Sequence, residues 1–382
     1  MIIGIAGPMS LELLKKKLPE NIELPSGYPF PMTAMLVNGL IERGYRVIAF
    51  TTSKGIREPL VLHGHKLTLC IAKWQPHAAR DLFYSERKDL LMLMKEYQAD
   101  IINAQWSYEF AWAASSAKIP CLITLRDHAM TIFRYQTDPY RFMRLIMNYI
   151  VLKKAKYLSV NSKYLYNKLD TQKKGRTRII PNFYPKFIEG LAYNQAEKSK
   201  YILSVSNGFG KIKNIDTALK AFALVRKYYH DIEYYLIGDG MEPSGPAYQF
   251  AKKKNIICGV KFLGKVPFNE VINKIHKAQI FLHPSREESF GMAVLEAMIM
   301  GTPVIGGEKS GNIPYLLDHG KAGELCNVNS PEDIEKSILK ILQDEDYAEK
   351  LMSNAYIYAK KKYSENIIVS KYIDYYYDIL NQ

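Results

Sequence analysis

The stretch HPSREESFGMAVLEAMIMGTPVI, residues 283–305, carries the pattern that decides the fold. An apolar run at Ile280–Leu282 leads into its polar first residues, and the segment 291–300 then has the composition of a helix. Gly301 lies where a glycine commonly ends a helix, and the proline that follows two residues later prevents continuation. A second apolar run, Pro303–Ile305, comes next. Strand, helix and strand in this order predict a parallel β-α-β unit.

The same alternation of short apolar runs and amphipathic segments extends through most of the chain. This alternation is typical of α/β domains built on parallel sheets. Further strands are expected at Met1–Ala6, Val47–Thr51, Ile101–Ala104, Cys121–Leu125, Tyr157–Val160, Arg178–Ile180, Tyr201–Val205, Tyr234–Ile237 and Val260–Leu263, and helices at Thr33–Arg43 and about 214–228.

A chain of 382 residues exceeds the size at which a single core keeps growing, so two domains are expected. The segment Tyr184–Lys200 has no clear period and is interpreted as a linker. We therefore predict two Rossmann-like domains facing a cleft, at about 1–190 and 196–363. In open sheets of this kind the ligand binds at the carboxyl ends of the strands.

The positive charge is concentrated in the first half of the chain. Residues 1–190 contain 28 Lys and Arg against 15 Asp and Glu, whereas residues 191–382 contain 24 against 23. A basic half indicates an anionic partner, which is a nucleic acid, an anionic membrane surface or a phosphorylated substrate. The four cysteines are widely spaced without a CxxC pair, and no signal peptide or membrane-spanning run is evident. A cytoplasmic protein, soluble or peripheral on the inner face of the membrane, is expected.

Two glutamates flank the start of the helix predicted at 291–300. Glu288 lies in the loop just before this helix and Glu296 on its second turn. The amides from Phe290 to Ala293 have no acceptor within the helix and form a ready anion site. Gly291 removes side-chain bulk where a phosphate or sugar would approach.

This stretch resembles the retaining glycosyltransferases of family 4, of the bacterial cell-surface polysaccharide type, which have the two-domain GT-B fold. Their E-x7-E motif corresponds to Glu288 and Glu296 within ESFGMAVLE. The resemblance implies that Glu296 holds the ribose hydroxyls of the donor, and that Glu288, a catalytic residue, lies at the transferred sugar and diphosphate. The neighbouring donor-binding residues would be Ser289, Phe290, Gly291 and Met292.

A glycine turn at 206–214 follows a predicted strand and offers backbone amides together with a cation for a diphosphate. Family members usually have a Gly-Arg turn followed by a lysine. Lys213 matches that lysine and is assigned a catalytic role, and Gly208 is assigned to donor binding. Asn207 stands near the expected arginine, so Lys211 is the candidate replacement.

Three further segments resemble the family more loosely. The backbone at Val266 matches the segment that faces the nucleotide base, and Gly27 matches a glycine-rich loop beside the donor diphosphate. His128 follows the strand CLITL and matches a catalytic histidine near the transferred sugar, with Asp127 expected to orient it. The tyrosines of 372–377 are expected to pack a terminal helix, about 364–382, that crosses back to the first domain.

The resemblance implies a metal-independent hexosyltransferase without a cofactor, which transfers a sugar from a nucleoside diphosphate sugar to an acceptor hydroxyl with retention. The donor would bind the second domain and the acceptor the first. A lipid-linked glycan of surface polysaccharide or lipopolysaccharide synthesis is the expected acceptor. Lys15–Lys17 and Arg141–Lys156 could dock on an anionic membrane.

Other functions remain open from the sequence. A GT-B sugar epimerase or phosphorylase is the alternative within the enzymes. A basic nucleic-acid-binding protein also fits the charge of the first half, but it leaves the donor motif unexplained. We therefore expect no nucleic acid among the partners.

Overall fold

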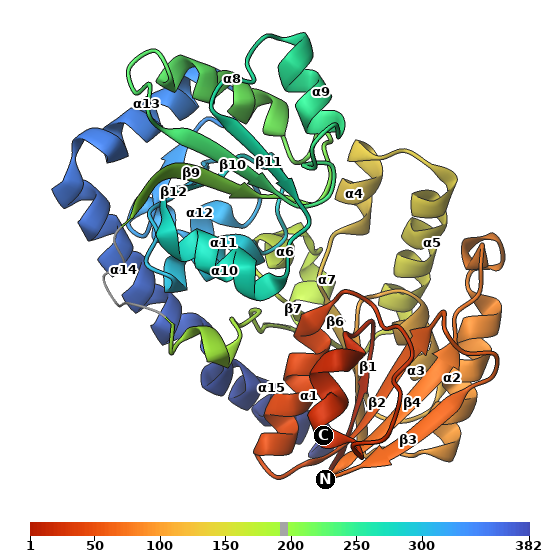
Figure 1. Ribbon diagram of the computed structural model, residues 1–382. Coiled ribbons are helices and arrows are strands. Elements are labelled where there is room, and N and C mark those ends of the chain that lie inside the picture. The colour runs from red at the N-terminus through yellow and green to blue at the C-terminus, as the bar shows by residue number, and fades with distance from the viewer. Residues whose placement is uncertain (192–197) are drawn as a thin grey trace. The chain divides into compact units, whose positions relative to one another are not determined.

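The computed structural model describes residues 1–191 and 198–382, which divide into two compact units. The first unit consists of Met1–Phe183 together with Glu365–Gln382, and the second unit lies within Tyr184–Ser364. Figure 1 shows that each unit has its own sheet with helices on both faces. Among the described residues, no helix is long and apolar enough to cross a membrane.

The first unit is built on an eight-stranded sheet in the order β3-β4-β2-β1-β5-β6-β7-β8. All neighbouring strands run parallel except β3, which pairs antiparallel with β4 at one edge. The strand order reverses direction between β1 and β5. The strands are β1 (Ile2–Ala6), β2 (Arg46–Ser53), β3 (Leu60–Gly64), β4 (Leu67–Lys73), β5 (Ile101–Gln105), β6 (Cys121–Leu125), β7 (Tyr157–Val160) and β8 (Thr177–Ile179).

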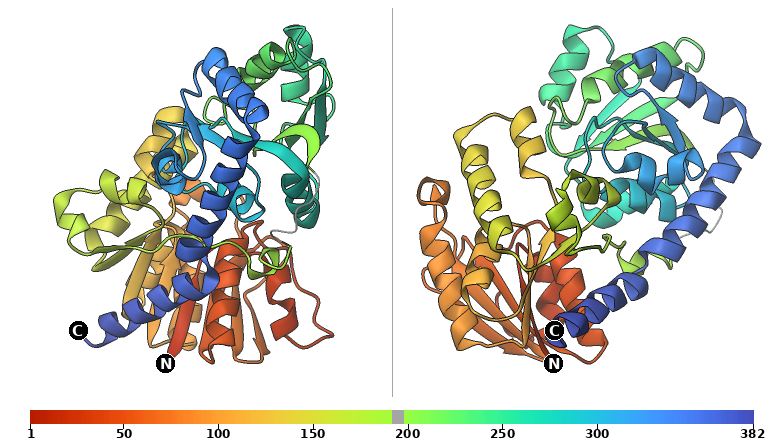
Figure 2. Two further views of the ribbon diagram at one scale, coloured as in Figure 1. Left: turned by 90° about the vertical axis from the view of Figure 1, so that its left-hand side faces the viewer. Right: turned by 180° about the vertical axis from the view of Figure 1, so that it is seen from behind.

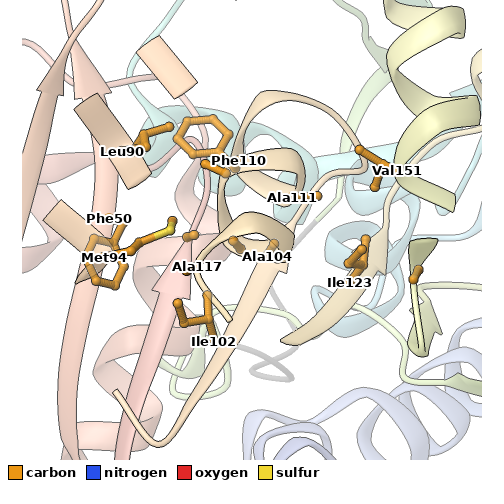
Figure 3. Close-up of a cluster of buried hydrophobic side chains, with 14 of the residues drawn as sticks. Phe50, Leu90, Met94, Ile102, Ala104, Phe110, Ala111, Ala117, Ile123 and Val151 are labelled. Carbon is orange, nitrogen blue, oxygen red and sulfur yellow. The ribbon is translucent and has the colours of Figure 1, made fainter. Parts of the chain in front are cut away.

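One face of this sheet packs against helices from the middle of the unit. Figure 3 shows Leu90 and Met94 of α2, Phe110 and Ala111 of α3 and Val151 of α5 gathered over Ile102, Ala104 and Ile123 of the sheet. The helices of the unit are α1 (Pro31–Glu42), α2 (Tyr84–Glu96), α3 (Glu109–Ser116), α4 (Ala129–Tyr135), α5 (Pro139–Lys154), α6 (Lys163–Lys168), α7 (Thr171–Lys174) and α15 (Glu365–Leu380).

The opposite face of the first sheet carries the terminal helix α15, drawn in blue in Figure 2. Asn103 lies between two residues of the buried cluster, so its side chain points to the other face, where its Nδ2 donates to the hydroxyl of Tyr376 at 2.7 Å. Helix α1 packs beside α15, and a Cβ at Gly39 would lie 2.9 Å from Val369. The expected return of a tyrosine-rich terminal helix to the first domain is therefore confirmed.

The second unit has a six-stranded, fully parallel sheet in the order β11-β10-β9-β12-β13-β14. In chain order within the unit this is 3-2-1-4-5-6, which places the topological switch point between β9 and β12. The strands are β9 (Ser199–Val205), β10 (Glu233–Ile237), β11 (Val260–Gly264), β12 (Ala278–His283), β13 (Val304–Gly307) and β14 (Glu324–Cys326).

Both faces of the second sheet are buried. Leu203 and Phe281 face one cluster, with α10, α11 and α14, whereas Ile202 and Ile280 face the other, with α8, α9 and α13. The helices are α8 (Ile215–Val225), α9 (Pro246–Lys253), α10 (Phe268–Lys277), α11 (Met292–Ile299), α12 (Ile313–Leu316), α13 (Pro331–Gln343) and α14 (Glu345–Tyr363).

Every strand expected from the sequence is present, with ends that differ by two residues at most. The hairpin of β3 and β4 and the helices α2 to α7 were not predicted. The linker interpretation of Tyr184–Lys200 was only partly right, because Tyr184 and Ile188 are fully buried in the second unit. Residues 192–197 of that segment lie outside the described residues.

Candidate functional site

Two loops of the second unit meet at the carboxyl ends of β9 and β12, where the strand order reverses. The loop at 206–214 follows β9, and the loop at 284–291 follows β12. The amide of Arg286 donates to the carbonyl of Ile212 at 2.7 Å. Because the two strands are neighbours in the sheet, segments about 75 residues apart in the chain form one surface.

Two side chains that were not predicted fasten these loops together. Asn214 is fully buried, has a φ of 58°, and donates through Nδ2 to the carbonyls of Pro284 at 3.0 Å and Val328 at 2.7 Å. Arg286 donates to the carbonyl of Lys211 at 2.6 Å and to Asn329 Oδ1 at 2.7 Å. In the sequence, an asparagine directly after Lys213 is the signal that could have indicated this contact. These contacts of Arg286 hold the loop after β9 against the loop after β12.

Glu288 is the centre of the polar cluster at these loops. Its Oε2 lies 3.3 Å from Lys213 Nζ and 3.5 Å from His283 Nε2. Burial opposes ionisation of this carboxyl, but the Lys213 charge and His283 outweigh it and lower the pKa of Glu288 to about 2. The structure thus brings together two predicted residues, Glu288 and Lys213, with one that was not predicted, His283. His283 is the last residue of β12, and its side chain is almost fully buried.

Helix α11 begins at this cluster. Gly291 precedes its first residue with a φ of 100°, and a Cβ there would lie 2.9 Å from Ile313, so a glycine is required. In the first backbone hydrogen bond of the helix, the Leu295 amide donates to the Gly291 carbonyl at 3.0 Å. The amides of 292–294 therefore have no acceptor within the helix. The Phe290 ring is buried against Tyr363, so only the backbone of Phe290 is available to a ligand.

Glu296 lies on the second turn of α11, as predicted, and its side chain is 8% exposed. Burial raises the pKa of Glu296 to about 8. The two glutamates of the motif therefore differ in charge at neutral pH. Glu288 is ionised beside the charged Lys213, whereas Glu296 is mostly protonated.

The other predicted donor-binding residues are distributed around these loops. Gly208 has a φ of 97° with open space beside it, and Lys211 is exposed in the same loop. Ser289 and Met292 are half-buried on either side of Gly291. Val266 follows β11, two strands away from β9, and packs partly against the core.

The first unit holds the remaining candidates, and one expectation there was wrong. Asp127 does not orient His128: its Oδ1 accepts from the Tyr108 hydroxyl at 2.7 Å. The imidazole Nδ1 instead accepts from the Thr131 amide at 3.3 Å and lies 2.7 Å from the Thr131 hydroxyl. His128 thereby caps the first turn of α4. Two consecutive side chains after a strand point in different directions, which explains the separation.

His128 is neutral at physiological pH in this setting. Burial and the nearby charges of Lys168 and Arg134 lower its pKa. Because Nδ1 accepts a hydrogen bond, the ring proton resides on Nε2, which can donate to a ligand. Gly27 belongs to a loop that lies close to residue 9, since a Cβ at position 27 would be 2.7 Å from the Met9 carbonyl oxygen.

Two family models match the chain in succession. The model described as glycosyltransferase family 4 matches residues 32–185, and the model described as glycosyl transferases group 1 matches residues 192–358. N-acetyl-alpha-D-glucosaminyl L-malate synthase of Bacillus anthracis is 32% identical over 188 residues, 49% of this chain and 48% of the relative. The matched part thus spans about half the length of that relative.

Solved structures with the same architecture cover the whole chain. Sucrose-phosphate synthase from Thermosynechococcus elongatus has a TM-score of 0.77 at 18% identity and covers 100% of this chain and 99% of that one. The Anabaena protein HepE, in complex with UDP and glucose, has a TM-score of 0.71 at 18% identity, and the match covers 99% of this chain and 100% of HepE. At this identity the likeness concerns the fold.

Proposed function

The chain belongs to glycosyltransferase family 4 and has the GT-B fold, and from this premise we propose that it transfers a hexose-type sugar from a nucleoside diphosphate sugar to an acceptor hydroxyl with retention of configuration. The observation that carries the proposal is the convergence of Lys213 and Glu288 at the switch point of the second unit, next to the free amides of α11. Such a site combines a cation and backbone donors for a departing diphosphate.

Each residue has a proposed role in donor binding. The amides of 292–294 and Lys213 would stabilise the leaving diphosphate, and Glu296 would accept from the ribose hydroxyls. In this scheme Lys213 supplies the positive charge, so we propose that no metal is needed. Attack from the same face as the departing phosphate would retain the anomeric configuration. UDP-sugars are the first donors to test, since HepE of the same fold binds UDP and glucose.

We assign the acceptor to the first unit. His128 would donate from Nε2 to the transferred sugar, and Gly27 would allow the diphosphate to approach its loop. A lipid-linked glycan of surface polysaccharide or lipopolysaccharide synthesis is the proposed acceptor, which fits the basic composition of residues 1–190. A diphosphate on a lipid is itself an anionic group.

We also propose that the segment Arg141–Lys156 docks on an anionic membrane. Arg144 is not part of the docking surface. Arg144 is turned inward, because its guanidinium lies 3.6 Å from Glu109 and 3.7 Å from the Tyr108 ring centroid. Exposed residues of the same region remain available for a membrane surface. They are Tyr140, Phe142, Tyr149, Lys153, Lys154 and Lys156.

Donor screening combined with paired substitutions tests the proposed function. Binding and turnover of UDP-, GDP- and ADP-sugars are followed by mass spectrometry with the wild-type chain, Glu296→Ala and Lys213→Ala. Glu349→Ala and Lys350→Ala serve as matched controls, since both side chains are exposed on α14. The site assignment is wrong if both site variants bind and transfer as the wild type does. A product in which the sugar is isomerised but not transferred would indicate an epimerase.

A further inference from the structure

Arg126 is a buried arginine at the carboxyl end of β6 in the first unit. Its side chain is 93% buried, being 7% exposed. Its guanidinium donates through Nε at 2.9 Å and Nη2 at 2.5 Å to Gln105 Oε1, and through Nη1 at 2.5 Å to Asn182 Oδ1. All of these acceptors are amide oxygens, and all are uncharged.

Within the described residues, no carboxylate forms an ion pair with this guanidinium. The guanidinium also lies near the Phe30 ring, whose centroid is 5.7 Å from the Arg126 Cζ. Tyr376 on α15 supplies no negative charge, because burial raises its pKa well above the ordinary value. A buried cation with only dipoles and a ring for partners carries a large desolvation cost, which a bound anion would offset.

A second observation points to the same ligand. Gln105 is fully buried, and its Nε2 has no hydrogen-bond partner in the described part of the chain. Buried amide donors are almost always paired in folded proteins. The oxygen of this amide is already held by Arg126, so the orientation of the amide is set and its nitrogen is left to donate elsewhere.

The topology places both groups where ligands bind in open sheets. Gln105 is the last residue of β5, and it is aligned with Thr124 of β6, two residues before Arg126. Alternate residues share a face of the sheet, so Gln105 and Arg126 project from the same face. The neighbouring pair β1 and β5 is the point at which the strand order of the first sheet reverses.

We propose that Arg126 and Gln105 form an oxyanion-binding site in the first unit that takes a phosphate group. Three of the five N–H groups of Arg126 are used by Gln105 and Asn182, which leaves two for the oxygens of an anion. The Gln105 Nε2 donates to the same anion. An arginine with an adjacent amide donor suits the planar, multiple hydrogen bonding that phosphates accept.

The phosphate belongs either to the acceptor or to the donor diphosphate. Identifying it with a substrate rests on the proposed function, whereas the existence of the site does not. Inorganic phosphate is therefore the first probe, since its binding is measurable whether or not the chain transfers sugar. UDP is the second probe, because it reports on the donor diphosphate.

Gln105→Glu is the decisive variant. It keeps the size of the side chain and supplies the negative charge that Arg126 lacks, so it should raise the melting temperature of the unliganded chain. It should also abolish phosphate binding to the first unit. Gln98→Glu, an exposed position in the same unit, controls for the added charge. Lys213→Ala removes the cation of the donor site and thus controls for phosphate that binds the second unit.

Thermal unfolding with and without phosphate measures the change in melting temperature, and calorimetric titration measures the affinity for phosphate and for UDP. Both are carried out at constant ionic strength. Phosphate at about ten times its Kd should raise the melting temperature by about 2–4 °C in Lys213→Ala and in Lys213→Ala combined with Gln98→Glu, but not in Lys213→Ala combined with Gln105→Glu. Unchanged UDP affinity in Gln105→Glu then assigns the site to the acceptor, and weakened UDP affinity assigns it to the donor. A phosphate effect that persists when Gln105→Glu is combined with Lys213→Ala, or that disappears in Lys213→Ala alone, overturns the proposal, as does a Gln105→Glu chain that is less stable than the wild type.

Discussion

Lys213 and Glu288 lie 75 positions apart in the chain, yet the Nζ of one is 3.3 Å from the Oε2 of the other. The pair forms where the loops after β9 and β12 meet, and His283 approaches the same carboxylate oxygen at 3.5 Å. The lysine that we propose to neutralise a diphosphate is thus paired with the first glutamate of the motif. A diphosphate bound at this site would compete with Glu288 for Lys213.

Replacing Lys213 with alanine should lower kcat about 100- to 1000-fold, the range found when one donor to a developing anion is removed. The same change should raise the pKa of Glu288, since the Lys213 charge is the main influence that lowers it. Steady-state kinetics with the preferred nucleotide sugar measures the fall in kcat. Lys350→Ala, on the exposed face of α14, should retain the wild-type rate. A rise in KM with an unchanged kcat would contradict a role in the transition state and would show that Lys213 binds substrate and transition state equally.

Donor binding should strengthen as the pH rises through 8, because Glu296 must lose its proton to accept two ribose hydroxyls. With a pKa of about 8, about a tenth of the free chain is ionised at pH 7 and about nine-tenths at pH 9. The donor affinity should therefore increase roughly tenfold between these values. Calorimetry in buffers of different ionisation enthalpy should detect proton release on binding.

The Glu296→Gln variant serves as the matched test of this pH dependence. Its donor affinity should vary little between pH 7 and 9, whereas Glu349→Gln should behave as the wild type does. The stability of the folded chain should fall as the pH rises, whereas donor affinity should increase. The folded chain holds the Glu296 proton up to about pH 8, whereas the ordinary pKa is 4.5, so its contribution to the free energy of unfolding falls as the pH rises between these values. Glu296→Gln should remove that loss.

Replacing His283 with alanine should lower kcat and leave donor affinity nearly unchanged, because His283 lies beside Glu288 at 3.5 Å and we expect it to position that carboxylate. His283→Asn retains a side-chain donor at this position and should recover part of the rate. His230→Ala, at an exposed site of the same unit, controls for the loss of an imidazole. A weakened donor affinity without a change in kcat would contradict this positioning role.

Changing Lys153, Lys154 and Lys156 together to serine should reduce co-sedimentation with anionic liposomes severalfold at low salt. Each lysine near an anionic surface contributes about 1 kcal/mol, and salt screens this attraction. The three exposed lysines at 252–254 of the second unit provide a control with the same charge change. Equal sedimentation of both triple variants and the wild type would argue against docking through α5.

Local chemistry made much of the fold predictable. A glycine or proline at the end of a helix and the buried runs of parallel strands act over a few residues, so the elements around β12, α11 and β13 could be located closely. The hairpin of β3 and β4 was missed because its edge strand is only partly buried. The partners of side chains such as Asp127 and Arg144 were mispredicted for another reason. They depend on the direction in which a side chain leaves its strand or helix, which no short motif encodes.

The sequence by itself determined the second-unit motif, from Glu288 to Glu296, and with it the family. Only the tertiary structure decided which residues complete the site. The strand order β11-β10-β9-β12-β13-β14 brings Lys213, Asn214 and Arg286 to one edge of the sheet. The pairing of β5 with β6 leaves Arg126 beside a neutral amide instead of a carboxylate. The reason is physical, since strand pairing joins residues far apart in the chain, and the charge balance around a buried group is set by those neighbours.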